Sequence, residues 1–383
     1  MGGVAVKVFR NISYAAPPVG AARFAAPVPV DGVPREHGPS APAPDRRFPV
    51  DLSPVIGPGW VRGEDYLTVN VTTPSTTGSA PVMVFVHGGG FVSGTGQAPL
   101  YDGTSFARDG VVLVTLNYRL GAPGWLDLPG APRNRGLLDV VAALRWVRAH
   151  IGEYGGDPDQ VTVFGQSAGA MIVSALLVTP EAGGLFRRAI SQSGGLSPAT
   201  GEQAAETTRA LAGRLGIAAT AEAFAEIPDD RLVAELGRVP GGARLTPLGV
   251  VLDEIPPPHP VDLLAGTNSE ESRLYQLPEY SAAIDRMFSE GTRRLVERYD
   301  KAFTYEFDWR GGPFGACHTA ELPFVFDRVD LPELRTPGGL LGPSVPDGLA
   351  AELHGAWVRF AGTGDPGWTG ERRFTAGSGS SGR

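Results

Sequence analysis

The chain has 383 residues, of which 42% are hydrophobic and 19% are charged, a composition typical of a soluble globular protein and not of a disordered one. Its formal net charge of −8, with no cluster of Lys and Arg side chains, argues against a nucleic-acid-binding surface. No apolar stretch approaches the roughly 18 residues that a membrane-spanning helix needs.

The first 75 residues alternate short apolar strands with turns rich in Pro and Gly. The stretches "VAVKVF" (4–9) and "LTVNVTT" (67–73) have the period-two pattern of half-exposed strands. The segment between them, "ISYAAPPVGAARFAAPVPV" (12–30), has too many prolines for regular structure. We therefore expect it to run over the surface.

The rest of the chain alternates buried strands with helices. Continuous apolar runs predict strands that are covered on both faces of a largely parallel sheet, at 81–86, 111–118, 161–164, 187–193 and 261–267. Helical periodicity predicts helices within 136–156, 170–178, 205–216, 229–239 and 349–360. Strands and helices in this order predict an α/β fold with right-handed crossovers, with reactive loops at the carboxyl ends of the strands.

We expect one α/β domain over residues 1–375, followed by a linker-like or tag-like tail, "AGSGSSGR" (376–383). The single cysteine, Cys317, excludes an intramolecular disulfide, so nothing demands an oxidising compartment. A cytoplasmic location is therefore expected, although a secreted protein without its signal peptide would have the same sequence. We expect a monomer or a weak homo-oligomer.

A serine lies between two glycines where a strand changes into a helix. In "VTVFGQSAGAMIV" (161–173), Ser167 follows the apolar run and precedes a helical pattern. A sharp strand-to-helix turn requires flanking residues without bulky side chains, and it turns the central side chain out of the sheet. This geometry suits a nucleophile, but the same residues are compatible with an ordinary glycine-rich turn.

A serine nucleophile needs hydrogen-bond donors for an oxyanion, a base, and a group that orients the base. "HGGGF" (87–91) follows a buried strand, and its glycines allow successive N–H groups to face one point. The alternatives are a plain flexible loop and a phosphate-binding loop, and the second is disfavoured because no G-K-[ST] follows.

Three histidines follow the serine, as the base does in α/β-hydrolases. His259 lies in a rigid "PPPHP" run, and His354 lies beside the buried stripe of a helix. His318, in "GPFGACHTAELPFVF", lies in a loop that enters an apolar segment. It is the best candidate on this pattern, although a lone histidine in a loop is usually structural.

Several motifs resemble those of the type-B carboxylesterases and cholinesterases, in the order of that family and over nearly the whole chain. They are "FRNISYAAPPVGAARF", "EDYLTVNV", "HGGGF", "NYRLG", "GLLD", "GGDPDQVTVFGQSAGA", "RRAISQSG", "GTNSEES" and "HTAELPFVF". The resemblance implies an α/β-hydrolase fold, with a mostly parallel central sheet and helices on both faces, and a serine esterase that needs no metal or organic cofactor.

Carried over residue by residue, the resemblance implies Ser167 as nucleophile, His318 as base and Glu271 as the orienting acid. Glu271 is preferred to its neighbour Glu270 because the family's acid is the second of two adjacent acidic residues shortly after a glycine. The implied oxyanion donors are the N–H groups of three small residues, Gly89, Gly90 and Ala168. Two structural ion pairs are also implied, Arg23 with Glu64 and Arg119 with Asp139.

The chain departs from the family in three places. Gln166 precedes the serine where the family usually has an acidic residue, and Tyr66 replaces a cysteine that often forms a disulfide. Only 46 residues, 272 to 317, separate Glu271 from His318, far fewer than the family normally has. This predicts a reduced lid and gorge.

We therefore expect a serine carboxylesterase that forms an acyl-enzyme, prefers short acyl groups and accepts a broad range of alcohols. One alternative is a non-catalytic, adhesion-type relative that uses the fold to bind proteins, but such relatives lose at least one triad residue. Another is an esterase of the hormone-sensitive-lipase kind, which has an aspartate shortly before its histidine. The expected partner is a small ester.

Overall fold

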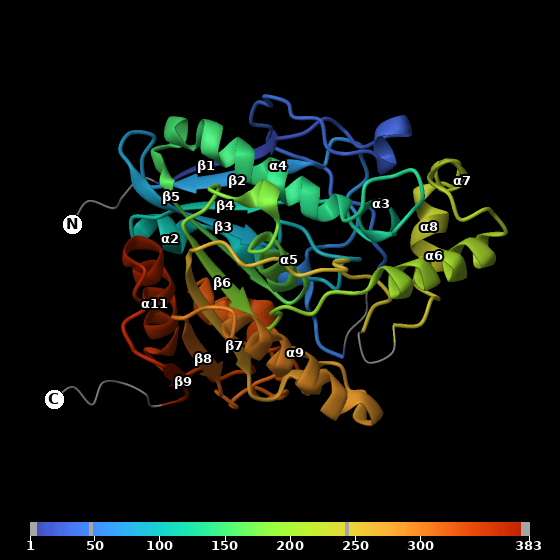
Figure 1. Ribbon diagram of the computed structural model, residues 1–383. Coiled ribbons are helices and arrows are strands. Elements are labelled where there is room, and N and C mark those ends of the chain that lie inside the picture. Colours follow the sequence, from blue (N-terminus) through green and yellow to red (C-terminus); the bar gives the residue numbers. More distant parts are fainter. Residues whose placement is uncertain (1–5, 46–48, 242–244, 377–383) are drawn as a thin grey trace.

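The central element of the structure is a mixed sheet that runs through the whole molecule (Figure 1). The computed structural model describes residues 6–45, 49–241 and 245–376. Within them, nine strands pair in the order β1-β2-β4-β3-β5-β6-β7-β8-β9. The strands are β1 (Lys7–Ser13), β2 (Thr68–Thr73), β3 (Ala80–Val86), β4 (Val112–Leu116), β5 (Gly156–Gln166), β6 (Arg188–Gln192), β7 (Asp262–Asn268), β8 (Phe303–Phe307) and β9 (Glu371–Phe374).

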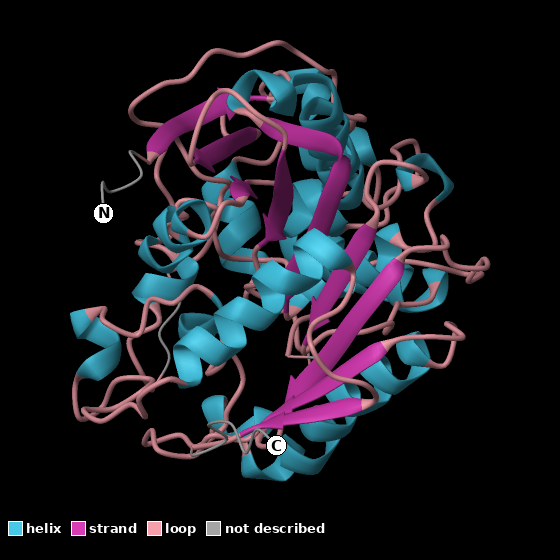
Figure 2. Cartoon of the chain, turned by 90° about the vertical axis from the view of Figure 1, so that its left-hand side faces the viewer, coloured by secondary structure: helices cyan, strands magenta, loops and turns pink. Residues whose placement is uncertain are grey.

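The sheet is antiparallel at one edge and parallel elsewhere. β1 pairs antiparallel with β2, and β2 with β4, whereas every pairing from β4 through β9 is parallel. Figure 2 shows the strands twisting progressively along the sheet, as the right-handed twist of L-amino-acid strands requires. All the parallel strands therefore end at one edge, where connecting loops can meet.

Helices cover both faces of the sheet (Figures 1 and 2). The longer helices are α4 (Arg135–His150), α5 (Ala168–Leu176), α6 (Gly201–Leu215), α8 (Asp229–Leu236), α9 (Ser281–Val296) and α11 (Leu349–Thr363). The shorter ones are α1 (Ser53–Ile56), α2 (Thr104–Arg108), α3 (Gly121–Trp125), α7 (Ala221–Ala225) and α10 (Leu322–Val325). Single 3₁₀ turns include Gly20–Phe24, Ile151–Tyr154, Glu271–Leu274 and Pro278–Tyr280.

The strands are buried on both faces because their alternate residues belong to two different apolar cores. In β3, Val82, Val84 and Val86 pack into the core under α4 and α5, while Met83 and Phe85 pack into the core under α2, α10 and α11. This is the environment that a continuous apolar run predicts. None of the described helices is long and apolar enough to cross a membrane.

The predicted α/β architecture is confirmed, with small shifts at the strand ends. The first strand begins at Lys7 instead of Val4, and residues 1–5 lie outside the described residues, as do residues 377–383 of the predicted tail. The proline-rich segment forms little more than the single turn Gly20–Phe24.

One of the two predicted ion pairs is confirmed and the other is wrong. Arg119 and Asp139 are fully buried, and two guanidinium nitrogens of Arg119 donate to the carboxylate at 2.9 and 2.7 Å. Arg23, however, pairs with Asp229 instead of Glu64. Asp229 is the first residue of α8, so the guanidinium joins the N-terminal segment to that helix, while Glu64 lies exposed.

Candidate active site

The predicted nucleophile lies on a strained turn. Ser167 connects β5 directly to α5 and has φ 57° and ψ −125°, a positive φ that costs a residue with a side chain about 1–3 kcal/mol and is found mostly at functional sites. Its N–H donates to the Gln192 carbonyl at 2.9 Å, which fixes the turn against β6. The side chain is only partly buried and lines a pocket.

The two glycines of the motif are required by close backbone contacts. A Cβ on Gly169 would lie 2.0 Å from the Val86 carbonyl oxygen, and one on Gly165 would lie 2.6 Å from the backbone of Gly169. Both distances are far below van der Waals contact. The turn can therefore pack against the end of β3 only with glycine at these two positions.

The predicted base and acid meet from different loops. His318 lies between β8 and α10, and its Nδ1 is 2.6 Å from Glu271 Oε2; both side chains are buried. The His318 N–H also donates to the Glu271 carbonyl at 3.2 Å. The other Glu271 oxygen accepts from the Asn268 N–H at 2.8 Å. The carboxylate is therefore held on both oxygens, with one facing the imidazole.

Glu270 points elsewhere. Its side chain accepts from the Ala316 N–H at 3.2 Å and pairs with Arg273 and Arg310 near the surface. It thus holds the loop that leads to His318 without touching the imidazole. The preference for Glu271 over Glu270 agrees with this geometry.

The other two histidines that follow the serine lie outside the pocket. His354 is buried in α11, where its Nδ1 contacts the Val325 carbonyl at 2.7 Å. His259 Nε2 contacts the Thr179 carbonyl at 2.8 Å. His318 is therefore the one of the three that reaches the serine turn.

The glycine-rich loop lies against the serine turn. A Cβ on Gly88 would lie 3.1 Å from Ser167 Cβ, and Gly89 and Gly90 have φ values of 112° and 64°. Gly89, Gly90 and Ala168 all line the same pocket as Ser167. Ala168 is the first residue of α5, where the backbone N–H has no acceptor within the helix.

His87, which opens the loop, has a structural environment. It is stacked on Tyr118, its Nδ1 contacts the Gly88 carbonyl at 2.7 Å, and its own carbonyl accepts from Tyr118 Oη at 2.8 Å. Burial lowers the pKa of His87 to about 4, because a charged imidazole is poorly solvated there. His87 is therefore neutral at ordinary pH and fixes the loop.

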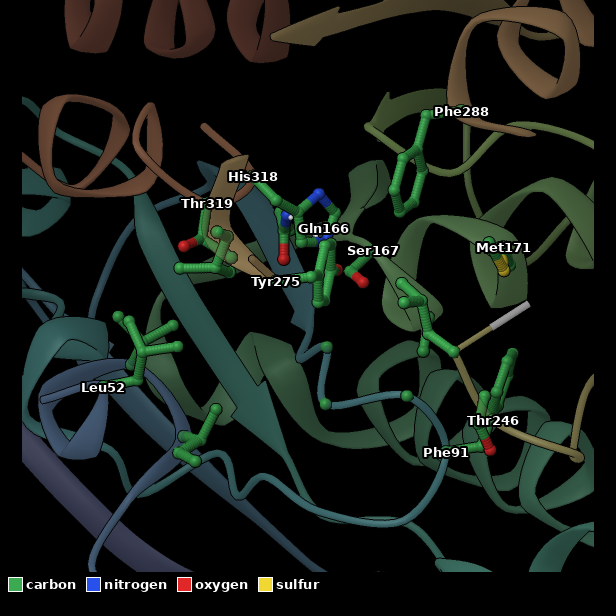
Figure 3. Close-up of a pocket in the computed structure, with 18 of the residues that line it drawn as sticks. Leu52, Phe91, Gln166, Ser167, Met171, Thr246, Tyr275, Phe288, His318 and Thr319 are labelled. Atoms are coloured by element: carbon green, nitrogen blue, oxygen red, sulfur yellow. Dashed lines mark hydrogen bonds between the residues drawn. The ribbon is translucent and has the colours of Figure 1, made fainter. Parts of the chain in front are cut away.

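The pocket encloses about 930 Å³, counting the part open to solvent. In Figure 3, Leu52, Thr319 and His318 lie on one side of Ser167, and Met171, Phe91 and Thr246 on the other. Apolar side chains make up most of the wall, and the described residues that line it include no Asp, Glu, Lys or Arg. Nor does any described part of the chain bring together three or more His, Cys, Asp or Glu side chains suited to hold a metal.

Two contacts at His318 were not predicted from the sequence. Phe288 of α9 stacks on the imidazole, with ring centroids 4.4 Å apart and an interplanar angle of 24°. Gln166 Nε2 lies 3.3 Å from His318 Nε2. No helix was predicted around Phe288, and Gln166 was noted only as the replacement of the family's usual acidic residue.

Fold and site together define an α/β-hydrolase with a serine, a histidine and a glutamate at the carboxyl edge of its sheet. The sequence model of the carboxylesterase family matches residues 1–277, and the chain belongs to this family. It acts on carboxylic esters, as the sequence analysis predicts. The matched part includes Ser167 and Glu271, whereas His318 lies beyond it.

Relatives of known activity align with most of the chain. The para-nitrobenzyl esterase of Bacillus subtilis is 34% identical over 436 residues, covering 94% of this chain and 87% of the relative. The phenmedipham hydrolase of Pseudarthrobacter oxydans is 33% identical, with the same coverage of 94% and 87%. The first alignment is longer than this chain, so the relative has segments that this chain lacks.

Solved structures show the same fold. A thermophilic para-nitrobenzyl esterase superposes with a TM-score of 0.85 at 30% identity, covering 98% of this chain and 94% of that one. A carboxylesterase from Geobacillus stearothermophilus superposes with a TM-score of 0.81 at 31% identity, with coverage of 98% and 94%.

Proposed function

We propose that Ser167, His318 and Glu271 form the catalytic triad, and that the N–H groups of Gly89, Gly90 and Ala168 form the oxyanion hole. The observation that carries this proposal is the 2.6 Å contact between Glu271 and His318, in the pocket that also contains the strained Ser167 turn. The acidic partner of His318 is Glu271 and not an aspartate shortly before the histidine, which disfavours a site of the hormone-sensitive-lipase kind. All three triad residue types are present, which disfavours a non-catalytic adhesion protein.

In the first step, Ser167 Oγ attacks the ester carbonyl carbon and His318 Nε2 accepts the hydroxyl proton. The carbonyl oxygen becomes negative and accepts from the three backbone N–H groups, each worth about 2.7–4 kcal/mol in comparable sites. Glu271 keeps the Nδ1 proton in place and stabilises the imidazolium. His318 then gives its proton to the departing alcohol, and water repeats the sequence on the acyl-enzyme.

The proton transfer from His318 to the departing alcohol indicates which side of the pocket receives the alcohol and which receives the acyl group. The alcohol must leave beside His318 Nε2, because that nitrogen protonates it. The side that carries Leu52 and Thr319 therefore receives the alcohol, and the side that carries Met171 and Thr246 receives the acyl group (Figure 3).

We further propose that the enzyme prefers neutral esters with short acyl groups and accepts varied alcohols. Only one long helix, α9, lies within the 46 residues from 272 to 317, so little chain is available to wall the pocket deeply. Each buried CH₂ contributes about 0.8 kcal/mol, a gain that stops once an acyl chain reaches solvent. A cationic alcohol gains nothing, because no acidic side chain lines the described pocket.

The test is kcat/KM for p-nitrophenyl esters from acetate to decanoate, together with one choline ester. We expect the highest value among the short esters, no preference for choline, and complete loss of activity in Ser167→Ala. The thermal stability of that variant stays near wild type, because the partly exposed hydroxyl contributes little to packing. An optimum at eight or more acyl carbons or a marked choline preference contradicts the proposed preference for short, neutral esters. An active Ser167→Ala contradicts the proposed triad.

A further inference from the structure

The proton-accepting nitrogen of His318 is already occupied in the structure. With its Nδ1 proton donated to Glu271 at 2.6 Å, a neutral imidazole has a single lone pair left, on Nε2. Within the described part of the chain, that nitrogen has a hydrogen-bonding partner in the side-chain amide of Gln166, at 3.3 Å (Figure 3). Among the described residues, no hydrogen bond joins Ser167 to His318.

The amide and the imidazole are both held in place. Gln166 ends β5 and is 2% exposed, and a Cβ on Gly88 would lie 3.0 Å from its Oε1. The amide oxygen thus packs against the glycine-rich loop and the amide nitrogen faces the lone pair, which can accept only from a donor. Phe288 covers one face of the imidazole at 4.4 Å, which restricts rotation of the ring.

We propose that Gln166 is a positioning residue that holds the lone pair of His318 in the resting enzyme and must leave it before Ser167 can transfer its proton. This inference rests on the proposed function, since it takes Ser167 as nucleophile and His318 as base. Gln166 neither gains nor loses a proton. When its amide turns away, the Ser167 hydroxyl donates to Nε2, and its proton moves there as Oγ bonds to the substrate.

The contact therefore slows every reaction of Ser167 by the strength of one hydrogen bond, about threefold to tenfold for an ordinary one. A purely structural role for the Gln166 side chain predicts a different result. If Gln166 only filled space and satisfied its own amide, removing the amide would lower stability and would not make Ser167 more reactive.

The experiment uses diisopropyl fluorophosphate, a small probe that needs neither side of the pocket filled. Ser167 Oγ forms a bond to phosphorus, fluoride leaves, and the hydroxyl proton passes to His318. In Gln166→Met, which keeps the length of the side chain but has no donor, we expect the second-order rate constant at pH 7.5 to rise about threefold to tenfold. Gln166→Asn, whose amide is one methylene too short to reach His318, should show the same rise.

Gln192 provides a matched control. It pairs with Gln166 across β5 and β6 and is buried, but its amide bonds Glu321 at 3.2 Å and Trp357 at 3.1 Å instead of His318. Gln192→Met should therefore show no acceleration.

Unchanged or slower labelling in both folded Gln166 variants overturns the inference, as does equal acceleration in Gln192→Met. A wild-type enzyme that is not labelled at Ser167 overturns the proposed function instead. The two failures are thus distinguishable.

Discussion

Two adjacent carboxylates, Glu270 and Glu271, have different environments because a 3₁₀ turn begins between them. Glu271 is the first residue of the turn Glu271–Leu274, and its side chain points inward to His318 with 2% exposure. Glu270 points outward to two arginines and the Ala316 N–H. One residue of register thus separates a carboxylate that can orient the base from one that fixes a loop.

We expect Glu271→Gln to lower kcat by about 10⁴-fold, because an uncharged amide neither holds the required imidazole tautomer nor stabilises the imidazolium. Glu270→Gln should cost less than about tenfold, since it only loosens the loop that carries His318. Steady-state kinetics on one p-nitrophenyl ester, with circular dichroism to verify folding, measures both. A larger loss at Glu270 would show that the other carboxylate serves the base.

At the scale of single residues, the motifs predicted which side chains lie together in the proposed active site, but not all of their contacts. Ser167, Glu271 and His318 lie in stretches whose order and residue types are typical of the family. The partner of Arg23 could not be found in this way, because Asp229 lies some two hundred positions later at the start of a short helix. The contact of Gln166 with His318 was hidden for the same reason, since it depends on where a distant loop places the imidazole.

Among the elements, the β5–α5 connection depends most strictly on its sequence. Val86 at the end of β3 lies so close to Gly169 in α5 that no side chain fits between them. The strand that precedes the glycine-rich loop and the helix that follows Ser167 are therefore locked together. Any shift between them moves the proposed oxyanion donors relative to the nucleophile.

Gly169→Ala should lower the free energy of unfolding by at least about 2 kcal/mol and reduce activity, because the backbone of β3 or α5 must move to accommodate the methyl group. Gly213→Ala in α6 is the control. It is exposed and a Cβ there meets no atom within 4 Å, so the change should stabilise the helix by roughly 0.5–1 kcal/mol. Urea unfolding measures both, and equal effects would mean that the close contact at Gly169 is easily relieved.

The two strands that the sequence patterns did not predict, β8 and β9, lie late in the chain. β8 has the alternating burial of a half-covered strand, but it is only Phe303–Phe307. β9 is the edge strand Glu371–Phe374, whose first three residues are charged. A strand as short as β8, or as polar as β9, gives little periodic signal. The long apolar runs of β3 and β4 are instead typical of strands that are buried on both faces of a parallel sheet.

At the scale of the whole molecule, one buried carboxyl group lies at the carboxyl ends of β6 and β7. Glu321, three residues after His318, is fully buried and has no cationic partner among the described residues; its oxygens accept from Asn268 at 2.7 Å and Gln192 at 3.2 Å. Burial, followed by the negative charge of Glu271, raises the pKa of Glu321 to about 7. The titratable groups that surround it are Glu271, His318, Cys317, Tyr101 and Tyr305.

This carboxyl group makes the stability of the whole fold depend on pH. In the unfolded chain Glu321 ionises near its ordinary pKa of 4.5, whereas in the folded protein it stays protonated up to about pH 7. Between these values the unfolded state binds fewer protons, so the free energy of unfolding falls as pH rises, by up to about 1.4 kcal/mol per pH unit from this residue. Above about pH 8 the contribution is constant.

Glu321→Gln removes this titration without removing the side chain. We expect the stability of wild type relative to the variant, from urea unfolding, to fall steadily from pH 5 to pH 7 and then level off. The contribution of His87, whose pKa is lowered to about 4 by burial, has the opposite sign, because protonation in the unfolded state below its ordinary pKa costs stability. It is common to both proteins and cancels in the difference. A difference that stays constant over this range would show that Glu321 is ionised in the folded enzyme, with its charge held by the amides of Asn268 and Gln192.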